Sequence, residues 1–101
     1  MMRFRRWIIR DNEATIELLP FDLLSEQTIT QWIKDAFDQS VTPEYGADWL
    51  VWPIHLQHFW LLRYCCLTSN LWFELQVTEQ FCEAGRELCS YLSRYIEVPH
   101  G

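Results

Sequence analysis

The first part of the chain has the apolar and polar spacing of a β-hairpin. Residues 3–10 combine strand-forming side chains with rough alternation, and residues 14–19 alternate cleanly between apolar and polar positions. In the second segment Ala14, Ile16 and Leu18 share one face, and Asp-Asn-Glu between the two segments is typical of a turn. We therefore predict that these two segments pair as antiparallel strands.

The next pattern has the period of a helix. Apolar residues recur at spacings of three and four along residues 26–39, with polar residues on the opposite side. Ser25 is a suitable N-cap, and Glu26 places a negative charge in the first turn, where the helix dipole favours it. This segment is predicted to be an amphipathic helix.

The last third of the chain repeats the order of strands and helix. Residues 59–67 and 71–77 are predicted to form a second hairpin, with the odd positions of 71–77 facing the core and Trp72 on the opposite face. A buried helix is the alternative for residues 53–67, because Pro53 suits a helix start.

A final helix is predicted over residues 79–96, with Thr78 as its N-cap. Gly85 interrupts its apolar stripe and lowers helix stability by about 1 kcal/mol relative to alanine. This cost suggests that a neighbouring backbone approaches closely at that position.

Together these elements predict a single α+β domain over residues 1–101. The order is β-β-α, loop, β-β-α: one unit over 3–40, an aromatic connection over 41–58, and a second unit over 59–97. Such an order implies an antiparallel sheet with two amphipathic helices packed on one face.

The charge of the chain is distributed unevenly. The formal net charge is -6, and four arginines lie in the first ten residues. From residue 11 onward, 14 acids face 4 bases, which leaves -10 on the body of the protein. An acidic body argues against a nucleic-acid partner. We also expect no membrane partner and a cytoplasmic location, since the most apolar window contains several polar residues and no signal peptide is recognisable.

The sequence offers no trusted metal or catalytic motif. His55 and His58 are three residues apart, but the four cysteines match no zinc spacing, and reduced thiols are the default in a cytosolic chain. Asp35 and Asp38 fall on the polar side of a helix, where solvation explains them. With three glycines in all, loops that cradle a phosphate are essentially excluded. We therefore predict no metal, no cofactor and no enzyme activity. The cysteines are Cys65, Cys66, Cys82 and Cys89.

Large aromatics among acidic residues are the composition of a protein-binding patch. Such residues gather in the connection and on the outward side of the second hairpin. The candidate partner-binding residues are Glu44, Tyr45, Asp48, Trp49, Trp52, Trp72 and Glu74. The alternative is that the connection folds back and its tryptophans fill the open face of the sheet.

These features favour a small, acidic, non-enzymatic module that binds another protein with a basic surface. Its sharpest form is an inhibitor, such as an immunity protein or antitoxin that neutralises a basic toxin or nuclease. Two other classes stay open. One is a structural or assembly subunit that homodimerises or docks through exposed aromatics, and the other is a thiol or zinc protein.

Overall fold

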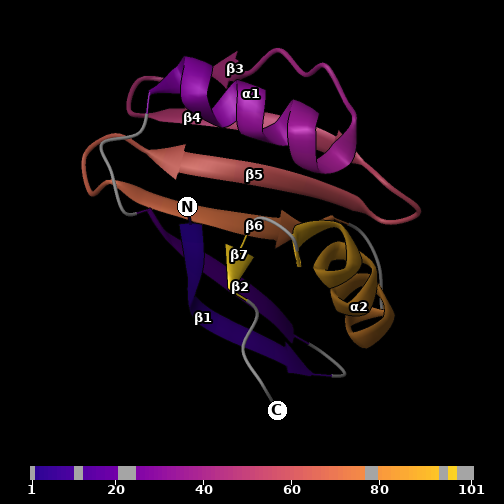
Figure 1. Cartoon of the computed structure of the whole chain (residues 1–101). Coiled ribbons are helices and arrows are strands. Elements are labelled where there is room, and N and C mark those ends of the chain that lie inside the picture. The colour runs from indigo at the N-terminus through magenta and orange to yellow at the C-terminus, as the bar shows by residue number, and fades with distance from the viewer. Residues whose placement is uncertain (1, 11–12, 21–24, 77–79, 94–95, 98–101) are drawn as a thin grey trace.

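The computed structural model is an α+β fold in which two helices lie against one sheet (Figure 1). It describes residues 2–10, 13–20, 25–76, 80–93 and 96–97. The described elements, in chain order, are β1 (Met2–Arg10), β2 (Glu13–Pro20), α1 (Glu26–Phe37), β3 (Glu44–Tyr45), β4 (Trp49–His55), β5 (Phe59–Cys65), β6 (Asn70–Leu75), α2 (Phe81–Leu92) and β7 (Ile96–Glu97).

The strands form one sheet in the order β3-β4-β5-β6-β2-β1-β7. Neighbouring strands are antiparallel, except that β7 pairs parallel with the start of β1. The pair that joins the two halves of the sheet is β2 with β6, which are far apart in sequence. Its register covers only Ile16–Leu18 against Leu71–Phe73, so the two halves are joined along a short seam.

Both predicted hairpins are present, as β1 with β2 and β5 with β6. Ser25 caps α1 as expected, accepting a hydrogen bond from the Thr28 backbone N–H at 3.1 Å. The helix ends at Phe37 because Asp38 turns into the left-handed region with φ 55°. The expected cap Thr78 lies outside the described residues, and Gln80 holds the cap position of α2 without a side-chain capping bond.

The predicted order of elements is wrong between the two helices. The connection expected over residues 41–58 contains β3 and β4, so the order is β-β-α-β-β-β-β-α-β. Within residues 53–67, 53–55 and 59–65 are strand rather than helix, with a bend at 56–58 and a turn from residue 66. The second helix ends at Leu92, before the predicted residue 96, and Ile96 belongs to β7.

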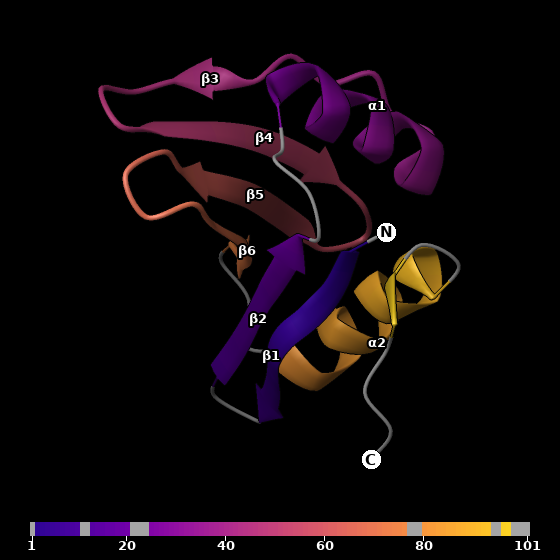
Figure 2. The ribbon, with the colours of Figure 1, turned by 60° about the vertical axis from the view of Figure 1, so that its left-hand side comes forward.

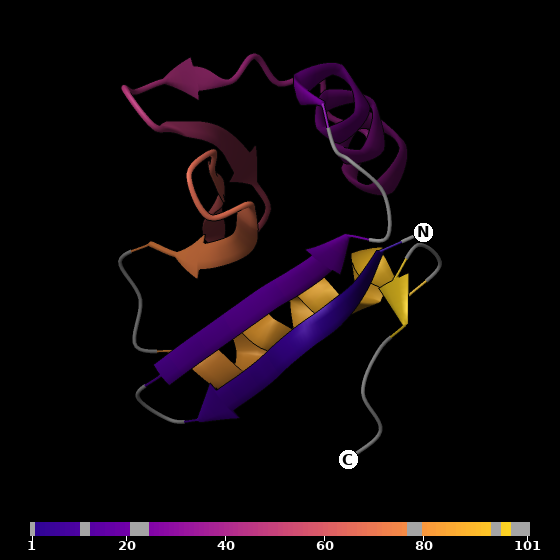
Figure 3. The same cartoon turned by 90° about the vertical axis from the view of Figure 1, so that its left-hand side faces the viewer.

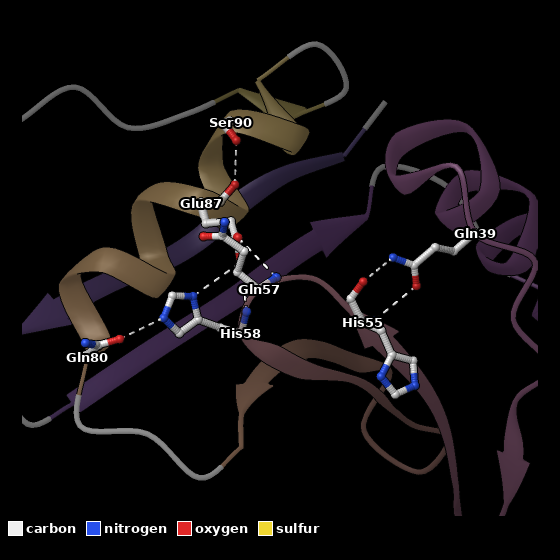
Figure 4. Close-up of polar contacts among 7 residues, drawn as sticks. All are labelled: Gln39, His55, Gln57, His58, Gln80, Glu87 and Ser90. Carbon is white, nitrogen blue, oxygen red and sulfur yellow. Dashed lines mark hydrogen bonds and ion pairs between the residues drawn. The ribbon is translucent and has the colours of Figure 1, made fainter.

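Strand β4 tolerates Pro53 because β3 covers only its first part. Glu44 and Tyr45 of β3 pair with Val51 and Leu50, which leaves the later backbone groups of β4 at an edge. The missing N–H of Pro53 faces this edge and costs no ladder bond. Two residues on, the Gln39 side chain bonds both the N–H and the C=O of His55, at 3.0 and 2.6 Å (Figure 4). A side-chain amide therefore takes the place of a neighbouring strand.

Both helices pack on the same side of the sheet, here called the inner face (Figure 2). Figure 3 shows the β1–β2 hairpin in front of α2, so α2 covers the inner side of these two strands. Aromatic rings join the layers: Phe37 of α1 contacts Phe73 of β6 and Tyr91 of α2, with ring centroids 6.2 and 5.6 Å apart. One hydrophobic cluster connects the sheet with both helices.

Gly85 of α2 faces this core, but a side chain rather than a backbone approaches it. A Cβ added at Gly85 would lie 2.9 Å from Ile9 Cδ1 of β1. The close contact expected from the sequence is therefore present with a different partner.

Candidate binding surface on the outer face of the sheet

The face of the sheet opposite the helices, here called the outer face, is built by the alternation of side chains along each strand. Directly paired residues of antiparallel strands share a face. One row of paired residues crosses six strands on the outer face: Glu44, Val51, Arg63, Trp72, Glu17 and Arg6. The next row on the inner face is wholly apolar: Trp52, Leu62, Phe73, Ile16 and Trp7. Charge is therefore confined to the outer of the two rows.

Trp72 is the centre of the outer face. It is half-buried on β6, with Arg63 of β5 paired on one side and Glu17 of β2 on the other. The Arg63 guanidinium forms an ion pair with Glu74, two residues along β6 on the same face. The predicted outward position of Trp72 and Glu74 agrees with this placement.

Trp49 lies on the outer side of β4, near the β3 end of the sheet. Its side chain is 41% exposed, and its ring lies against Gly46, where an added Cβ would be 2.0 Å from Trp49 Cε2. The absence of a side chain at Gly46 is what allows this ring position. Phe59, 37% exposed, adds a third outer aromatic and stacks on His55 with ring centroids 4.6 Å apart.

Two of the candidate residues do not lie on the outer face. Trp52 is fully buried on the inner face, and its indole N–H donates to Thr30 of α1 at 3.0 Å. Tyr45 pairs with Leu50 on the helix side of the sheet, and its hydroxyl donates to Glu26 of α1. This bond to a carboxylate raises the pKa of Tyr45 above its usual value. Trp52 is therefore a core residue and no part of an exposed surface.

The two acidic candidates not yet described, Glu44 and Asp48, lie at the end of the sheet formed by β3. Glu44 is exposed and shares the outer face with Val51, to which it is paired. Asp48 is exposed in the turn before β4, where its backbone C=O accepts from the Cys66 N–H at 2.8 Å. The structure thus brings Glu44, Trp49, Trp72 and Glu74 to one face.

A second polar cluster joins the β4–β5 hairpin to α2 (Figure 4). The Glu87 carboxylate accepts the backbone N–H groups of Gln57 and His58, at 3.2 and 3.1 Å. The His58 ring lies between Glu87 and Gln80, with its two nitrogens each 3.3 Å from an acceptor. Only 10% of the His58 side chain and 14% of the Glu87 side chain are exposed. This cluster anchors the hairpin to the helix and leaves little room for a substrate.

None of the four cysteines forms a disulfide bond in the part of the chain that the structure describes: Cys65 and Cys66 lie at the end of β5, and Cys82 and Cys89 lie on α2. Cys65 ends β5, where hydrogen bonds from the Thr68 side chain and from the backbone N–H groups of Thr68 and Leu67 lower the pKa of its thiol. Burial raises the pKa of Cys89 on α2. Within the described residues, no group of three or more His, Cys, Asp or Glu side chains is close enough to hold a metal ion.

Three outer-face residues were missed from the sequence: Glu17, Phe59 and Arg63. The alternation in β2 already places Glu17 on the face opposite Ile16 and Leu18, so the sequence predicts that Glu17 points outward. The sequence does not predict that Glu17 lies beside Trp72, because the pairing of β2 with β6 is a contact between distant segments.

Among the helices that the structure describes, none is long and apolar enough to span a bilayer.

The chain matches no protein-family model, and comparison with curated proteins and with solved structures finds no similar protein. A function for this chain is therefore proposed from the outer face and its chemistry.

Proposed function

We propose that this protein is a small, non-enzymatic inhibitor that binds a basic protein through the outer face of its sheet. A toxin or nuclease is the class of partner that fits, which makes the protein comparable in role to an immunity protein or antitoxin. The observation that supports this proposal is a set of three partly exposed aromatic side chains on the face opposite both helices: Trp49, Phe59 and Trp72.

Aromatic side chains of this kind suit the centre of an interface. Trp and Tyr are enriched among the residues that dominate binding energy, because they bury a large area at small cost in conformational entropy. The core of this domain is closed by the inner-face residues and the two helices. The outer aromatics are therefore available to a partner.

Charge favours a basic partner over an acidic or neutral one. The chain beyond residue 10 carries 14 acids and 4 bases. On the outer face itself the acids Glu17, Glu44 and Glu74 lie beside Arg6 and Arg63, and Arg63 is already paired with Glu74. Oppositely charged surfaces raise the association rate by electrostatic steering. We expect binding that associates more slowly as the salt concentration rises.

The test is affinity capture with the full chain, followed by an inhibition assay. Wild-type protein is compared with a Trp49→Ser, Trp72→Ser double variant in a lysate of the native source, and captured proteins are identified by mass spectrometry. We expect wild type to retain a basic protein that the double variant loses. The purified partner should then lose its own toxic or nuclease activity when an equimolar amount of wild type is added.

Leu67→Ser is the matched control, because Leu67 is 75% exposed in the turn between β5 and β6 and lies outside the row of outer-face residues. Capture by this variant should equal that by wild type. Equal capture by the double variant contradicts the proposal. A salt-insensitive homodimer in sedimentation, disrupted by the same two substitutions, would favour the assembly-subunit alternative instead.

A further inference from the structure

We infer that the hollow beside Trp72 receives the cationic end of an arginine or lysine side chain from the partner protein. This inference rests on the proposed function and assigns a chemistry to its central contact. The hollow has a volume of about 340 Å³ and lies where β2 and β6 come together. Its outer lining consists of Thr15, Glu17, Asn70, Trp72 and Glu74.

The hollow follows from the short seam between the two halves of the sheet. Strands β2 and β6 are paired only over Ile16–Leu18 and Leu71–Phe73, and the hollow extends past the end of that pairing toward Ala14 and Glu74. A smaller hollow shares Glu17, Asn70 and Trp72 with the first and extends toward Leu18 and Leu71. Trp72 therefore lines both recesses.

The chemistry of the lining favours a cation. The face of an indole ring attracts a guanidinium or ammonium group, and a carboxylate nearby adds a charge-assisted hydrogen bond. Within the chain, Arg63 is paired across from Trp72 on β5, and its guanidinium forms an ion pair with Glu74. The equivalent place on the other side of Trp72 belongs to Glu17.

Glu17 is half-buried, and its carboxylate makes no hydrogen bond or ion pair to any side chain that the structure describes. Its cross-strand neighbour Arg6 is exposed on β1, away from Trp72. A partly desolvated carboxylate gains more from a cation than one in open water. Glu17 therefore supplies the charge that an incoming basic side chain would meet.

A larger recess elsewhere on the molecule fits a cation less well. It measures about 430 Å³ and lies between α1 and the segment leading to β3. No aromatic side chain lines it, its acid Glu26 already accepts from Tyr45, and Lys34 places a positive charge in the wall. Size alone therefore does not select the site.

The test is an NMR titration of the full ¹⁵N-labelled chain with a short arginine peptide, blocked at both ends. The citrulline peptide, which has the same shape without the charge, is the matched ligand. We expect the Trp72 indole N–H signal to shift and saturate with arginine and to stay in place with citrulline. Glu17→Gln should weaken arginine binding by about three- to fivefold.

Glu83→Gln is the control variant, because Glu83 is an exposed acid in the first turn of α2, on the helix side of the sheet. It should leave arginine binding unchanged. Equal shifts with citrulline, or an equal loss in Glu83→Gln, would overturn the inference. Capture that is lost in the Trp49, Trp72 double variant but unchanged in Glu17→Gln also overturns the inference and leaves the proposed function standing. If arginine binds here while the double variant captures the partner normally, the proposed function fails and the cation site stays.

Discussion

Trp49 and Trp52 lie on the same strand, three residues apart, but one is exposed to solvent and the other is buried. An odd spacing along a strand directs side chains to opposite faces. Trp52 points under α1 and is fully buried, with its N–H bonded to Thr30, whereas Trp49 lies on the outer face and stays 41% exposed. Composition marks both as large aromatics in one segment. The pleat of β4 decides which contributes to stability and which is available to a partner.

The two faces of the sheet extend this difference to every strand. Inner positions of β4, β5, β6 and β2 are mostly apolar and lie in or against the hydrophobic core, so their side chains are fixed by packing. Outer positions mix aromatic, acidic and basic side chains that the described fold does not need for its core. Substitutions on the two faces should therefore separate stability from binding.

The largest effect is expected for Trp52→Ala. Loss of a fully buried indole leaves a cavity and an unpaired Thr30 hydroxyl, and it should lower the free energy of unfolding by about 3–5 kcal/mol. Trp49→Ala should cost less than about 1 kcal/mol, because its ring is only partly covered. Urea denaturation followed by circular dichroism measures both. Similar losses for the two variants would show that the faces do not differ in this way.

A smaller difference in stability is expected between substitutions that release the two ends of the segment joining β4 to β5. Glu87 holds one end, and Gln39 holds the other. Glu87→Ala removes the acceptor of two backbone N–H groups and of the His58 ring, and should cost about 2 kcal/mol. Gln39→Ala removes a neutral, exposed pair of bonds to His55 and should cost about 1 kcal/mol or less.

The same denaturation assay checks this order, with His58→Ala, Glu87→Ala double variants to isolate the side-chain contact. The cost of losing Glu87 should fall in the His58→Ala background but not vanish, since the two backbone N–H groups remain. If Glu87→Ala cost no stability in the His58→Ala background, the contact with the His58 ring, and not the bonds to the two backbone N–H groups, would attach the hairpin to α2.

The sequence predicts those parts of this fold whose partners are close in the chain. Alternation in residues 14–19 and the helical period in 26–39 gave a hairpin and a capped helix that the structure confirms. Strand β4 was missed because both of its faces are apolar in the middle: Val51, on the outer side, is buried, as is Trp52 on the inner side. With no alternation visible and a proline inside, the segment resembles a connection.

The candidate surface was predicted only in part, for a related reason. Outward directions of Trp72 and Glu74 follow from alternation within one strand. The proximity of Glu17 to Trp72 depends on which strands become neighbours in the sheet, and that choice is made by packing of the whole core. Burial of Trp52 likewise depends on α1 lying above it.

Gly46→Ala tests why Trp49 lies where it does. The new methyl group would overlap the Trp49 ring, so the ring must leave its place, at a cost of about 1 kcal/mol in lost contact. The Trp49 indole signal in the NMR spectrum should move, while the signals of buried Trp52 and Trp60 stay. In a Trp49→Ala background the same substitution should cost almost nothing. A cost that persists there would place the restriction in the backbone at Gly46 instead.

The smallest effect is expected on the inner side, at Gly85. Alanine favours the helix by about 1 kcal/mol, but its Cβ would lie 2.9 and 3.0 Å from Ile9 Cδ1 and Cγ1, which must then shift. The two terms oppose each other, so Gly85→Ala alone should change stability by less than about 0.5 kcal/mol. In an Ile9→Ala background the contact is gone, and the same change should stabilise by about 1 kcal/mol, measured by urea denaturation. Equal effects in both backgrounds would show that Ile9 does not explain the glycine.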